Sequence, residues 1–305
     1  MWPTWENERL RIALALDTHS RNTCALPGIR DATRLKVLSW QFVASLRREK
    51  YYRLLRSRHT SAKHANPHLQ SFDAERAVAY HVQVGNTDEA SWLIFLMTHF
   101  ARPEDTGWLR LKHVYGGLNT RVWDWATVSG NPTLFTSWLN RNWRQLGGKF
   151  GNHRKYESLN PLSHASTSKV VESYVLWVGN RGHQYLFSSA IQNAGNHPHT
   201  IFDFLYNSMR VKRFGRLAKF DYLSLIGRYG IAPIDAGSAY LAGATGPARG
   251  ARLLFDDDPN SRTPEVRLQT KLDALDSDLQ VTMKVIEDAL CNWQKTPSRF
   301  VHFKG

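Results

Sequence analysis

The segment from Phe150 to Leu159 concentrates side chains that can do chemistry. Six consecutive polar or titratable residues lie within it: Asn152, His153, Arg154, Lys155, Tyr156 and Glu157. An acid, a base, cations and an aromatic ring in one segment are typical of the wall of a catalytic or binding cleft. The alternative is an exposed loop, although such loops more often carry glycine, serine and proline. Lys155 is also a candidate Schiff-base nucleophile, because an arginine precedes it and a Tyr-Glu pair follows it.

A second chemical segment begins at Met209 and is expected to form a helix with one cationic face. Its apolar residues recur at helical spacing, and Gly227 and Gly230 close it. Lys212, Arg216 and Lys219 follow one another at i, i+4 and i+7, which puts them on a single face that can bind phosphate. Asp221 borders the apolar face beside this basic stripe, a setting in which a carboxylate can act as an acid or a base.

A glycine-rich turn follows and is expected to join two helices. Gly246 permits a left-handed turn, Pro247 suits the start of the next helix, and Gly250 allows two helices to approach closely. The free N–H groups at that helix start can hold a phosphate with help from Arg249 and Arg252. The pattern resembles the helix-hairpin-helix of the DNA glycosylase superfamily, with one extra residue in the hairpin. A plain glycine turn between two packed helices is the alternative.

Composition narrows the class of protein. The 305 residues carry a net charge of +14, which favours a polyanionic partner such as nucleic acid. Only two cysteines, Cys24 and Cys291, are present, so a disulfide framework and a four-cysteine Zn or Fe–S site are excluded. The His197-Pro-His199 pair lacks further ligands at suitable spacing, and no metal or cofactor is expected. The chain opens without a signal-peptide pattern and has no long apolar run, which favours a cytoplasmic protein without membrane spans.

The rest of the chain is predicted to be helical. Residues 1–30 are expected to form a short helix and a loop, and Thr87 is expected to cap one of the later helices. Further helices are expected at 31–58, 73–84, 88–100, 107–118, 132–146 and 169–178. The helix at 88–100 contains a run that is apolar on all sides, which indicates a central buried position. Arg47 and Arg48 belong to a group of cations near the end of the helix at 31–58, and these either contact phosphate or interact with the helix dipole.

One long helix is expected from Val266 to Trp293, because seven apolar residues follow one another there at intervals of 3 or 4. Glu287 and Asp288 lie off that apolar face, in positions that are usually solvated, although one of them can turn back into a cleft. The fold is therefore expected to be mainly α, as two helical subdomains around a cleft. We expect a single catalytic unit made of an extension (1–30), a helical subdomain (31–200) and a hairpin with its C-terminal helix (201–305).

An ordered set of strings resembles one known family, the α-glutamyl/putrescinyl-thymine pyrophosphorylase family, third clade. The resemblance runs from about residue 25 to the end of the chain. The strings are Arg47-Arg48, Trp92 to Phe100, Gly151 to Ser158, Phe214-Gly-Arg, Phe220-Asp-Tyr-Leu, Thr245 to Arg252 and Glu287 to Gln294. The family is related to helix-hairpin-helix DNA glycosylases, and its name reflects a proposed role at hypermodified thymines in phage DNA. Related proteins include amino-acid-to-DNA transferases of phages and anti-phage glycosylases that remove glucosylated hydroxymethylcytosine and leave abasic sites.

The sequence departs from the wider glycosylase pattern in two places. Bifunctional glycosylases carry a catalytic lysine in the hairpin, where this chain has Ala248-Arg249-Gly250, which argues against a lyase step through that lysine. The superfamily also places a catalytic aspartate one helix beyond the hairpin. Asp256-Asp257-Asp258 comes too early for that position, so the usual acid cannot be assigned by alignment.

The resemblance implies cleavage of an N-glycosidic bond on a nucleotide flipped out of phage DNA. The carboxylate that stabilises positive charge on the sugar is expected to be Asp221 or Glu157, with Asp288 as a third candidate. The aromatic residues expected to stack on the extruded base are Tyr156, Phe220 and Tyr222. Residues 152–155 would supply hydrogen bonds to the base, and the hairpin and basic stripes would bind phosphates.

Two alternatives remain open at this point. A transferase would bind the same DNA and attach an amine or amino acid to an activated pyrimidine, as the family name implies. A non-catalytic protein would bind modified DNA without changing it, in which case charge reversal at Arg47, Arg48 and Arg216 would matter more than loss of any carboxylate. The oligomeric state is not indicated by any pattern.

Overall fold

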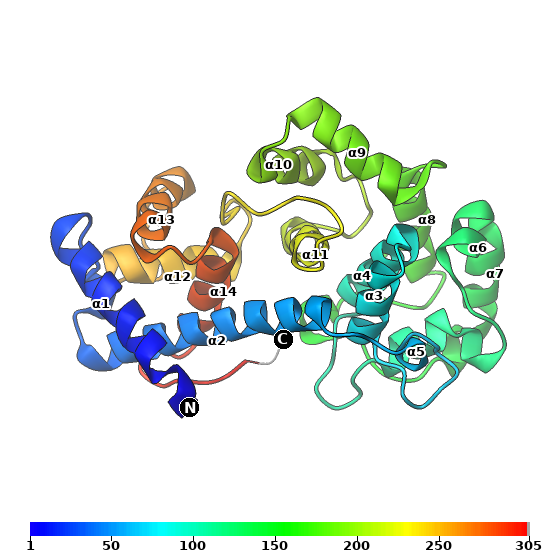
Figure 1. The fold of residues 1–305 in the computed structure, drawn as a ribbon, viewed down its shortest axis with the longest axis horizontal. Helices are drawn as coiled ribbons and strands as arrows, with labels where there is room; N and C mark the ends of the chain where they lie inside the picture. The colour runs from blue at the N-terminus through cyan, green and yellow to red at the C-terminus, as the bar shows by residue number, and fades with distance from the viewer. Residues whose placement is uncertain (304–305) are drawn as a thin grey trace. The chain divides into compact units, whose positions relative to one another are not determined.

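The computed structural model describes residues 1–303 and is built from helices. Within those residues there are fourteen α-helices and six short 3-10 helices, and no strand is formed. An isolated β-bridge joins Ser158 to Ser166. The mainly α fold predicted from the sequence is therefore confirmed (Figure 1). None of the helices in this part of the chain has both the length and the apolar character that crossing a bilayer requires.

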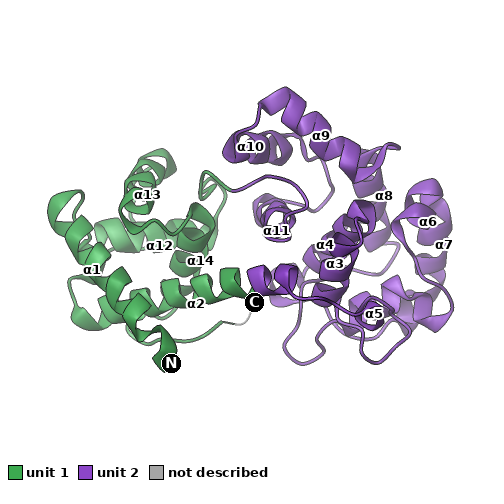
Figure 2. Ribbon diagram, viewed as in Figure 1, with its two compact units in different colours: residues 1–51, 236–304 green, residues 52–235, 305 purple. Residues whose placement is uncertain are grey.

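The chain divides into two compact units, which are coloured separately in Figure 2. Unit 1 contains Met1–Tyr51 and the chain from Ala236 to the end of the described residues, and unit 2 contains Tyr52–Asp235. Both ends of the described chain thus belong to the same unit. These boundaries differ from the divisions after residues 30 and 200 that the sequence suggested, because residues 1–30 share a core with the C-terminal helices.

Unit 1 holds four complete α-helices and the greater part of a fifth. Its elements are η1 (Pro3–Trp5), α1 (Glu6–Asn22), η2 (Pro27–Ile29), α2 (Ala32–Ser57), α12 (Thr245–Asp256), α13 (Glu265–Leu279) and α14 (Met283–Trp293). The last residues of α2, from Tyr52 onward, already belong to unit 2. The core is made by the apolar faces of these helices, with Leu38, Leu254, Leu272 and Ile286 fully buried.

Unit 2 holds the remaining nine complete α-helices of the described residues. Its elements are η3 (Ala62–His64), α3 (Ala74–Gln83), α4 (Thr87–Phe100), α5 (Leu109–Tyr115), η4 (Gly117–Asn119), α6 (Trp125–Gly130), α7 (Pro132–Asn142), η5 (Trp143–Gln145), η6 (Asn152–Arg154), α8 (Thr167–Val178), α9 (Gly182–Ala194), α10 (Pro198–Ser208) and α11 (Arg216–Arg228). Most of the helices predicted between residues 31 and 178 are confirmed within a few residues at each end.

The centre of unit 2 is α4, as its sequence predicted. Every residue from Glu89 to Phe100 is buried, and the helix contacts α3, α9 and α11 (Figure 1). Aromatic rings fill the space around it, and Phe95 stacks on Tyr174 with ring centroids 3.8 Å apart. The N-cap of α4 is Asn86 rather than Thr87, because the Asn86 side chain accepts from the backbone N–H of Glu89. A helix buried on all sides gives the segments at its two ends a rigid support.

The helix predicted in the segment that begins at Met209 starts later than expected. It begins at Arg216, and Gly215 precedes it as the N-cap residue. Lys212 therefore lies in the loop before α11, and Arg213 in the same loop has a left-handed backbone with φ of 63°. The prediction that three basic residues lie on one face of this helix is therefore wrong. Only Arg216 and Lys219 share the helix.

The glycine turn before α12 also differs from the prediction. Residues 229–244 contain no helix, and the left-handed glycine is Gly243 (φ 75°), whereas Gly246 lies inside α12. The expected role of Gly250 is supported, since a Cβ there would collide with the carbonyl of Leu290 on α14. Gly246 serves the same packing, because a Cβ there would meet the sulfur of Cys291 at 2.6 Å. The two glycines thus bring α12 against α14.

The single helix predicted from Val266 to Trp293 is wrong, since two helices, α13 and α14, occupy this stretch. The break lies at Gln280 (φ 53°) and Thr282 (φ 88°), which both have positive φ. The Asp276 side chain accepts from the Thr282 backbone N–H at 2.8 Å and fixes the break. The apolar spacing continues through it because both helices bury their apolar faces, and both contact α12. Hydrophobic spacing alone therefore does not detect the turn.

Candidate functional site

A cavity of about 410 Å³ lies within unit 2 and combines charge with aromatic surface. Its lining contains two arginines, two aromatic rings and one carboxylate. The lining residues are Arg110, Trp143, Arg144, Leu146, Phe150, Glu157, Ser158 and Leu159. The predicted chemical segment therefore does reach a cavity, through its last residues and through Phe150.

Arg110 is held rigidly at the cavity wall. Its Nε donates to the carbonyl of Gly147 at 3.3 Å, and its Nη2 donates to the carbonyl of Gly148. Its guanidinium also lies over the Phe150 ring, 4.8 Å from the centroid. Burial lowers the pKa of the Arg110 guanidinium from its ordinary value, although the group remains a cation at neutral pH. The cavity thus has one fixed positive charge, and Arg144, stacked on Trp143 at 4.8 Å, supplies a second.

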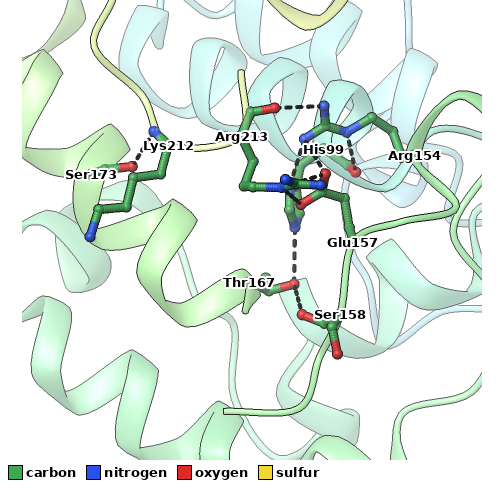
Figure 3. Close-up of polar contacts among 8 residues, drawn as sticks. All are labelled: His99, Arg154, Glu157, Ser158, Thr167, Ser173, Lys212 and Arg213. Atoms are coloured by element: carbon green, nitrogen blue, oxygen red, sulfur yellow. Dashed lines mark hydrogen bonds and ion pairs between the residues drawn. The ribbon is translucent and has the colours of Figure 1, made fainter. Parts of the chain in front are cut away.

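Glu157 is bound by two arginines, as Figure 3 shows. Arg213 Nε lies 3.2 Å from Oε1 and 3.4 Å from Oε2, and Arg154 Nη2 lies 3.6 Å from Oε1. The Glu157 side chain is only 4% exposed, whereas that of Arg213 is 34% exposed. A buried carboxylate needs partners of this kind, and two cations compensate its charge. Arg213 is the part of this cluster that solvent reaches most easily.

Arg154 is a structural support for the cluster, because nearly every donor of its guanidinium is used. Nε donates to the carbonyl of His99 at 3.3 Å, and Nη1 donates to the carbonyl of Arg213 at 3.0 Å. The guanidinium also lies 5.1 Å from the centroid of the Phe214 ring. Burial lowers the pKa of Arg154 from its ordinary value, and the negative charges of Glu157 and Asp221 oppose that change. Arg154 therefore fixes the left-handed loop at Arg213 and the carboxylate of Glu157 together.

His99 continues this network into the core (Figure 3). Its Nε2 lies 2.9 Å from Thr167 Oγ1, and that hydroxyl lies 3.1 Å from the carbonyl of Ser158. Because the hydroxyl donates to the carbonyl, it accepts from Nε2–H, which leaves Nδ1 of His99 to accept from Arg154 at 3.5 Å. Burial, then the charges of Arg154 and Arg213, hold the pKa of His99 well below its ordinary value. A neutral imidazole thus joins α4, α8 and the segment after η6.

The segment 151–158 is anchored at both ends. Gly151 N–H donates to the carbonyl of Phe100 at 2.8 Å, which ties the segment to the last turn of α4. A Cβ at Gly151 would lie 2.6 Å from that of Ala101, so only glycine allows this approach. At the other end, Ser158 N–H donates to Ala165 at 3.1 Å and its carbonyl accepts from Thr167 N–H at 2.8 Å. The segment is therefore a rigid turn and not a free loop.

Four of the six residues predicted in this segment do not line the cavity. Asn152, His153, Lys155 and Tyr156 are exposed and do not line it. Lys155 Nζ lies 5.2 Å from the centroid of the Tyr156 ring, so the two side chains form a cation–π pair on the surface. Lys155 is thus outside the cavity in which a Schiff base would have to form. Glu157 alone among the six reaches the cavity.

The structure gives the predicted site residues of α11 different roles. Asp221 is half-buried and close enough to Arg154 to favour its charged form, so it belongs to the same electrostatic cluster as Glu157. Phe220 and Tyr222 are core residues, 3% and 0% exposed. The Phe220 ring is covered by Arg216, and the Tyr222 hydroxyl lies 3.0 Å from that of Tyr174. Neither ring has a free face for a base, so the sequence interpretation of these two as base-stacking residues is replaced by a packing role.

The cations of unit 2 that were predicted to bind phosphate lie around the start of α11. Lys212 is exposed, and its backbone N–H donates to Ser173 Oγ at 2.9 Å (Figure 3). Lys219 Nζ donates to the carbonyl of Tyr206 at 3.1 Å. Burial, and then the charge of Arg210, lower the pKa of Lys219. Arg213 thus provides an exposed cation next to Glu157, and Lys212 is the exposed residue before it.

The predicted residues of α2 and α14 form a separate set in unit 1. Asp288 accepts from Arg48 Nη1 at 2.8 Å, from Asn292 Nδ2 at 3.1 Å and from the Ser45 hydroxyl. Glu287, expected to be solvated, is buried instead. Arg47 lies 4.3 Å from the centroid of the Trp2 ring. Asp288 and Arg48 therefore stabilise the packing of α14 on α2, and neither they nor Arg47 share a unit with Glu157 and Asp221.

The start of α12 carries a second cavity, of about 450 Å³, in unit 1. Arg249 and Arg252 line it, as the phosphate prediction required. Both are engaged, because Arg249 Nη1 donates to Asn260 Oδ1 at 3.0 Å and Arg252 Nη2 to Glu265 Oε1 at 2.7 Å. An anion entering here would compete with Glu265 for Arg252. Phosphate binding at Gly246, Gly250 and these arginines stays a prediction.

Sequence reasoning missed five residues of the site, which are Arg110, Trp143, Arg144, Arg213 and His99. Arg213 stands within the basic string before Phe214, but its left-handed backbone gives no signal in a single sequence. His99 stands at the end of an apolar helix, where a histidine is usually a core residue. The only sign in the sequence that Arg110 belongs to a site is the presence of aromatic and glycine residues near it in the chain. No three His, Cys, Asp or Glu side chains among the described residues gather closely enough to hold a metal ion.

Comparison with known proteins identifies a family. The family model described as alpha-glutamyl/putrescinyl thymine pyrophosphorylase clade 3 matches residues 33–305, in agreement with the resemblance found in the sequence. Neither a curated protein nor a solved structure matches the chain. The family description indicates an enzyme that acts on modified thymine. Since the match covers most of its length, the chain belongs to the alpha-glutamyl/putrescinyl thymine pyrophosphorylase clade 3 family.

Proposed function

We propose that the protein is a DNA N-glycosylase that excises a modified pyrimidine, a glucosylated hydroxymethylpyrimidine above all, from phage DNA in defence of the host. One observation carries the proposal: an acidic residue, Glu157, lines a cavity that also presents two arginines and two aromatic rings. The family description supports a DNA substrate with a modified pyrimidine. No cofactor is needed for this reaction.

The cavity has the size and the lining for an extruded base. At about 410 Å³ it exceeds a bare pyrimidine and leaves room for a sugar substituent. The rings of Trp143 and Phe150 provide apolar surface, while Arg110 and Arg144 supply donors for polar groups of the base or its adduct. Extrusion of a nucleotide from a duplex costs a few kcal/mol, and stacking and hydrogen bonding in such a pocket offset it.

In the proposed reaction the arginines stabilise negative charge on the departing base, and Glu157 acts on the water that attacks the sugar. When the bond between C1′ and N1 breaks, its electron pair leaves with the base and positive charge develops on the sugar. A guanidinium such as that of Arg110 stabilises the departing anionic base, which then takes up a proton. Water attacks C1′, and Glu157 accepts the proton that the water loses. Asp221 supports this arrangement through Arg154, which holds Glu157 in place.

Phosphate binding is assigned to the cations at the start of α11. Lys212 and Arg213 precede α11, and Arg216 begins it. Contacts of this kind add affinity without reading sequence, and each one makes binding weaker as salt rises. The arginines at the start of α12 and the cations Arg47 and Arg48 of α2 are further candidates on unit 1.

Incubation with two DNA substrates tests the proposal. DNA with glucosylated hydroxymethylcytosine should acquire alkali-labile abasic sites and release the free modified base, measured by mass spectrometry, while unmodified DNA should not. Glu157→Gln should lower the rate by about a hundredfold or more, since it removes the proton acceptor. The matched control is Glu172→Gln, at an exposed acid on α8, which should retain full activity.

Loss of folding in the Glu157→Gln variant is the main confounding result, because the carboxylate binds two arginines. Thermal unfolding measured by circular dichroism separates the two effects, and Glu157→Asp keeps the charge as a second comparison. If the folded Glu157→Gln variant released the base at the normal rate, Glu157 would not be the catalytic carboxylate. If neither substrate lost a base, the glycosylase proposal would be rejected.

A transferase is the second candidate, and two observations favour it. The family description names a pyrophosphorylase, and a pyrophosphate leaving group is an anion that the paired arginines of the cavity, Arg110 and Arg144, would bind. Glu157 would then accept a proton from the attacking amine. The same mass spectrometry distinguishes this candidate, because a transferase increases the mass of a base that stays in the DNA. A protein that merely binds modified DNA would change neither the base nor the strand.

A further inference from the structure

We infer that Tyr156 is a wedge that enters the base stack of duplex DNA when a nucleotide leaves it. The inference rests on the proposed function, because a nucleotide must move into the cavity beside Glu157. It goes beyond that function by assigning Tyr156 to the duplex that the base leaves and not to the base itself. The partner of this surface is therefore double-stranded DNA.

Tyr156 is unusually exposed for an aromatic residue. Its exposed fraction is 76%, and Tyr51, the next most exposed Phe, Trp or Tyr among the described residues, reaches 42%. Exposed aromatic surface of this size has no role in the stability of the fold. It is typical of side chains that contact a partner.

The turn that carries Tyr156 is rigid. Its first residue, Gly151, is anchored to the end of α4, as described above, and Arg154 inside it is buried. Glu157 N–H donates to the carbonyl of Arg154 at 3.0 Å, directly after Tyr156. A ring on a mobile loop would lose much conformational entropy on insertion, whereas a ring on an anchored turn is already oriented.

The chemistry around the ring fits a polyanion with stacked bases. Lys155 Nζ lies over the Tyr156 ring, and the exposed side chains of Asn152 and His153 belong to the same turn. The only acid of the turn is Glu157, whose carboxylate is bound to Arg213 and is almost completely buried. The exposed surface of the turn thus carries positive charge and hydrogen-bond donors together with one aromatic face.

Tyr156 directly precedes a residue that lines the cavity. Glu157 lines the cavity and Tyr156, the residue before it, does not. A nucleotide that reaches Glu157 therefore leaves its vacancy in the duplex close to the neighbouring Tyr156. Side chains that insert between base steps stabilise the opened duplex by occupying such a vacancy.

Binding to two duplexes tests the wedge without relying on catalysis. One duplex is intact, and the other has the same sequence with a single tetrahydrofuran abasic analogue, whose gap is already open. The full-length protein should bind the gapped duplex about tenfold more tightly at the same salt concentration, which corresponds to the stacking of one ring. Tyr156→Ala should reduce that preference to about twofold or less, and Tyr156→Trp should retain it. The matched control is Tyr185→Ala, at another exposed tyrosine of unit 2, which should also retain it.

The results of this binding experiment can be distinguished from those of the glycosylase assay. A wild-type protein without preference for the gapped duplex, or a Tyr156→Ala variant that keeps the preference, would overturn the wedge. Equal weakening of both duplexes and of single-stranded DNA would show that Tyr156 is a general contact and would also overturn it. A protein that shows the preference but releases no base would support the wedge and reject the glycosylase.

Discussion

Glu89 is a buried carboxylate in the first turn of α4, on the opposite end of that helix from the candidate site. It accepts from the Tyr115 hydroxyl at 2.6 Å and from the Trp125 backbone N–H at 2.7 Å. Burial raises the pKa of Glu89 to about 7, although the two hydrogen bonds oppose the change. The negative charges of Asp124 and Asp88 raise the pKa further. Glu89 is therefore a buried acid of unit 2 that changes charge near neutral pH.

This pKa predicts a specific dependence of stability on pH. Because the folded protein binds the proton of Glu89 more tightly than the unfolded chain, the contribution is fully present below pH 4.5 and is lost as pH rises to about 7. The loss amounts to about 3 kcal/mol at most. Glu89→Gln can still accept from the Trp125 N–H through its amide oxygen and can donate from its NH2 group to the Tyr115 hydroxyl oxygen, and it should remove this pH dependence. The measurement is the free energy of unfolding in urea at pH 5 and pH 8 for both proteins, and an unchanged difference would contradict the assignment.

Single residues of the candidate site were predictable only in part. The polar composition of 152–157 indicated a cleft, and Glu157 does line a cavity. The direction of each side chain could not be read from the sequence, because the 3-10 helix covers only Asn152–Arg154 and residues 155–157 follow no regular period. Arg213 was missed since a left-handed arginine has no sequence signature. Its contact with Glu157 joins residues 56 positions apart, which needs the fold itself.

Among the elements, the turn at 151–158 depends on one glycine at the end of α4. Gly151→Ala would place a Cβ 2.6 Å from Ala101 Cβ and 3.1 Å from the Ala101 carbonyl carbon. The turn should shift away from α4 and lose stability by about 1–3 kcal/mol. Because Glu157 and Tyr156 shift with it, both base release and the preference for gapped DNA should fall together. Circular dichroism should show that the helices themselves remain.

A matched glycine provides the comparison for that turn. Gly130, at the end of α6, has a φ that is not positive, and a Cβ added there would have no heavy atom within 4 Å. Gly130→Ala should leave stability and activity unchanged within error. If Gly151→Ala behaved in the same way, the close approach between the turn and α4 would not be required for the site.

The break between α13 and α14 gives a second prediction for an element. Gln280 ends α13 with a left-handed backbone, φ 53° and ψ 48°, which is unfavourable for a residue with a Cβ. Gln280→Gly should therefore raise the free energy of unfolding by about 1 kcal/mol. Thermal unfolding of the two proteins checks this. A decrease on replacement by glycine would mean that the Gln280 side chain makes a stabilising contact.

Helices were the most predictable elements, and their ends were the least. The helix at 88–100 followed from an apolar run, and α2 was predicted within one residue at each end. The division between α13 and α14 was not predictable because the apolar spacing continues across it and no glycine or proline marks it. The start of α11 at Arg216 was also missed. The apolar residues Met209, Val211 and Phe214 before it are buried although they lie in a loop, and their spacing resembles that of a helix face.

At the scale of the whole molecule, unit 1 is assembled from both ends of the chain. The family match begins at residue 33, yet α1 lies before that point and contributes to the core. Ile12 and Leu16 are fully buried with residues of α13 and α14. The His19 ring adds a contact at 2.6 Å to the carboxylate of Asp278 on α13. Residues 1–30 were expected to be an extension, but they are part of the hydrophobic core of unit 1.

Two leucines on α1 test whether the first helix is needed for that core. Leu16 is 0% exposed and Leu14 is 67% exposed. Leu16→Ala should lower the free energy of unfolding by about 2–5 kcal/mol, because it leaves a cavity against α13. Leu14→Ala should change it by less than about 0.5 kcal/mol. Urea unfolding of both variants is the measurement. An effect of Leu16→Ala as small as that of Leu14→Ala would show that Leu16 adds little to the core that α1 shares with α13 and α14.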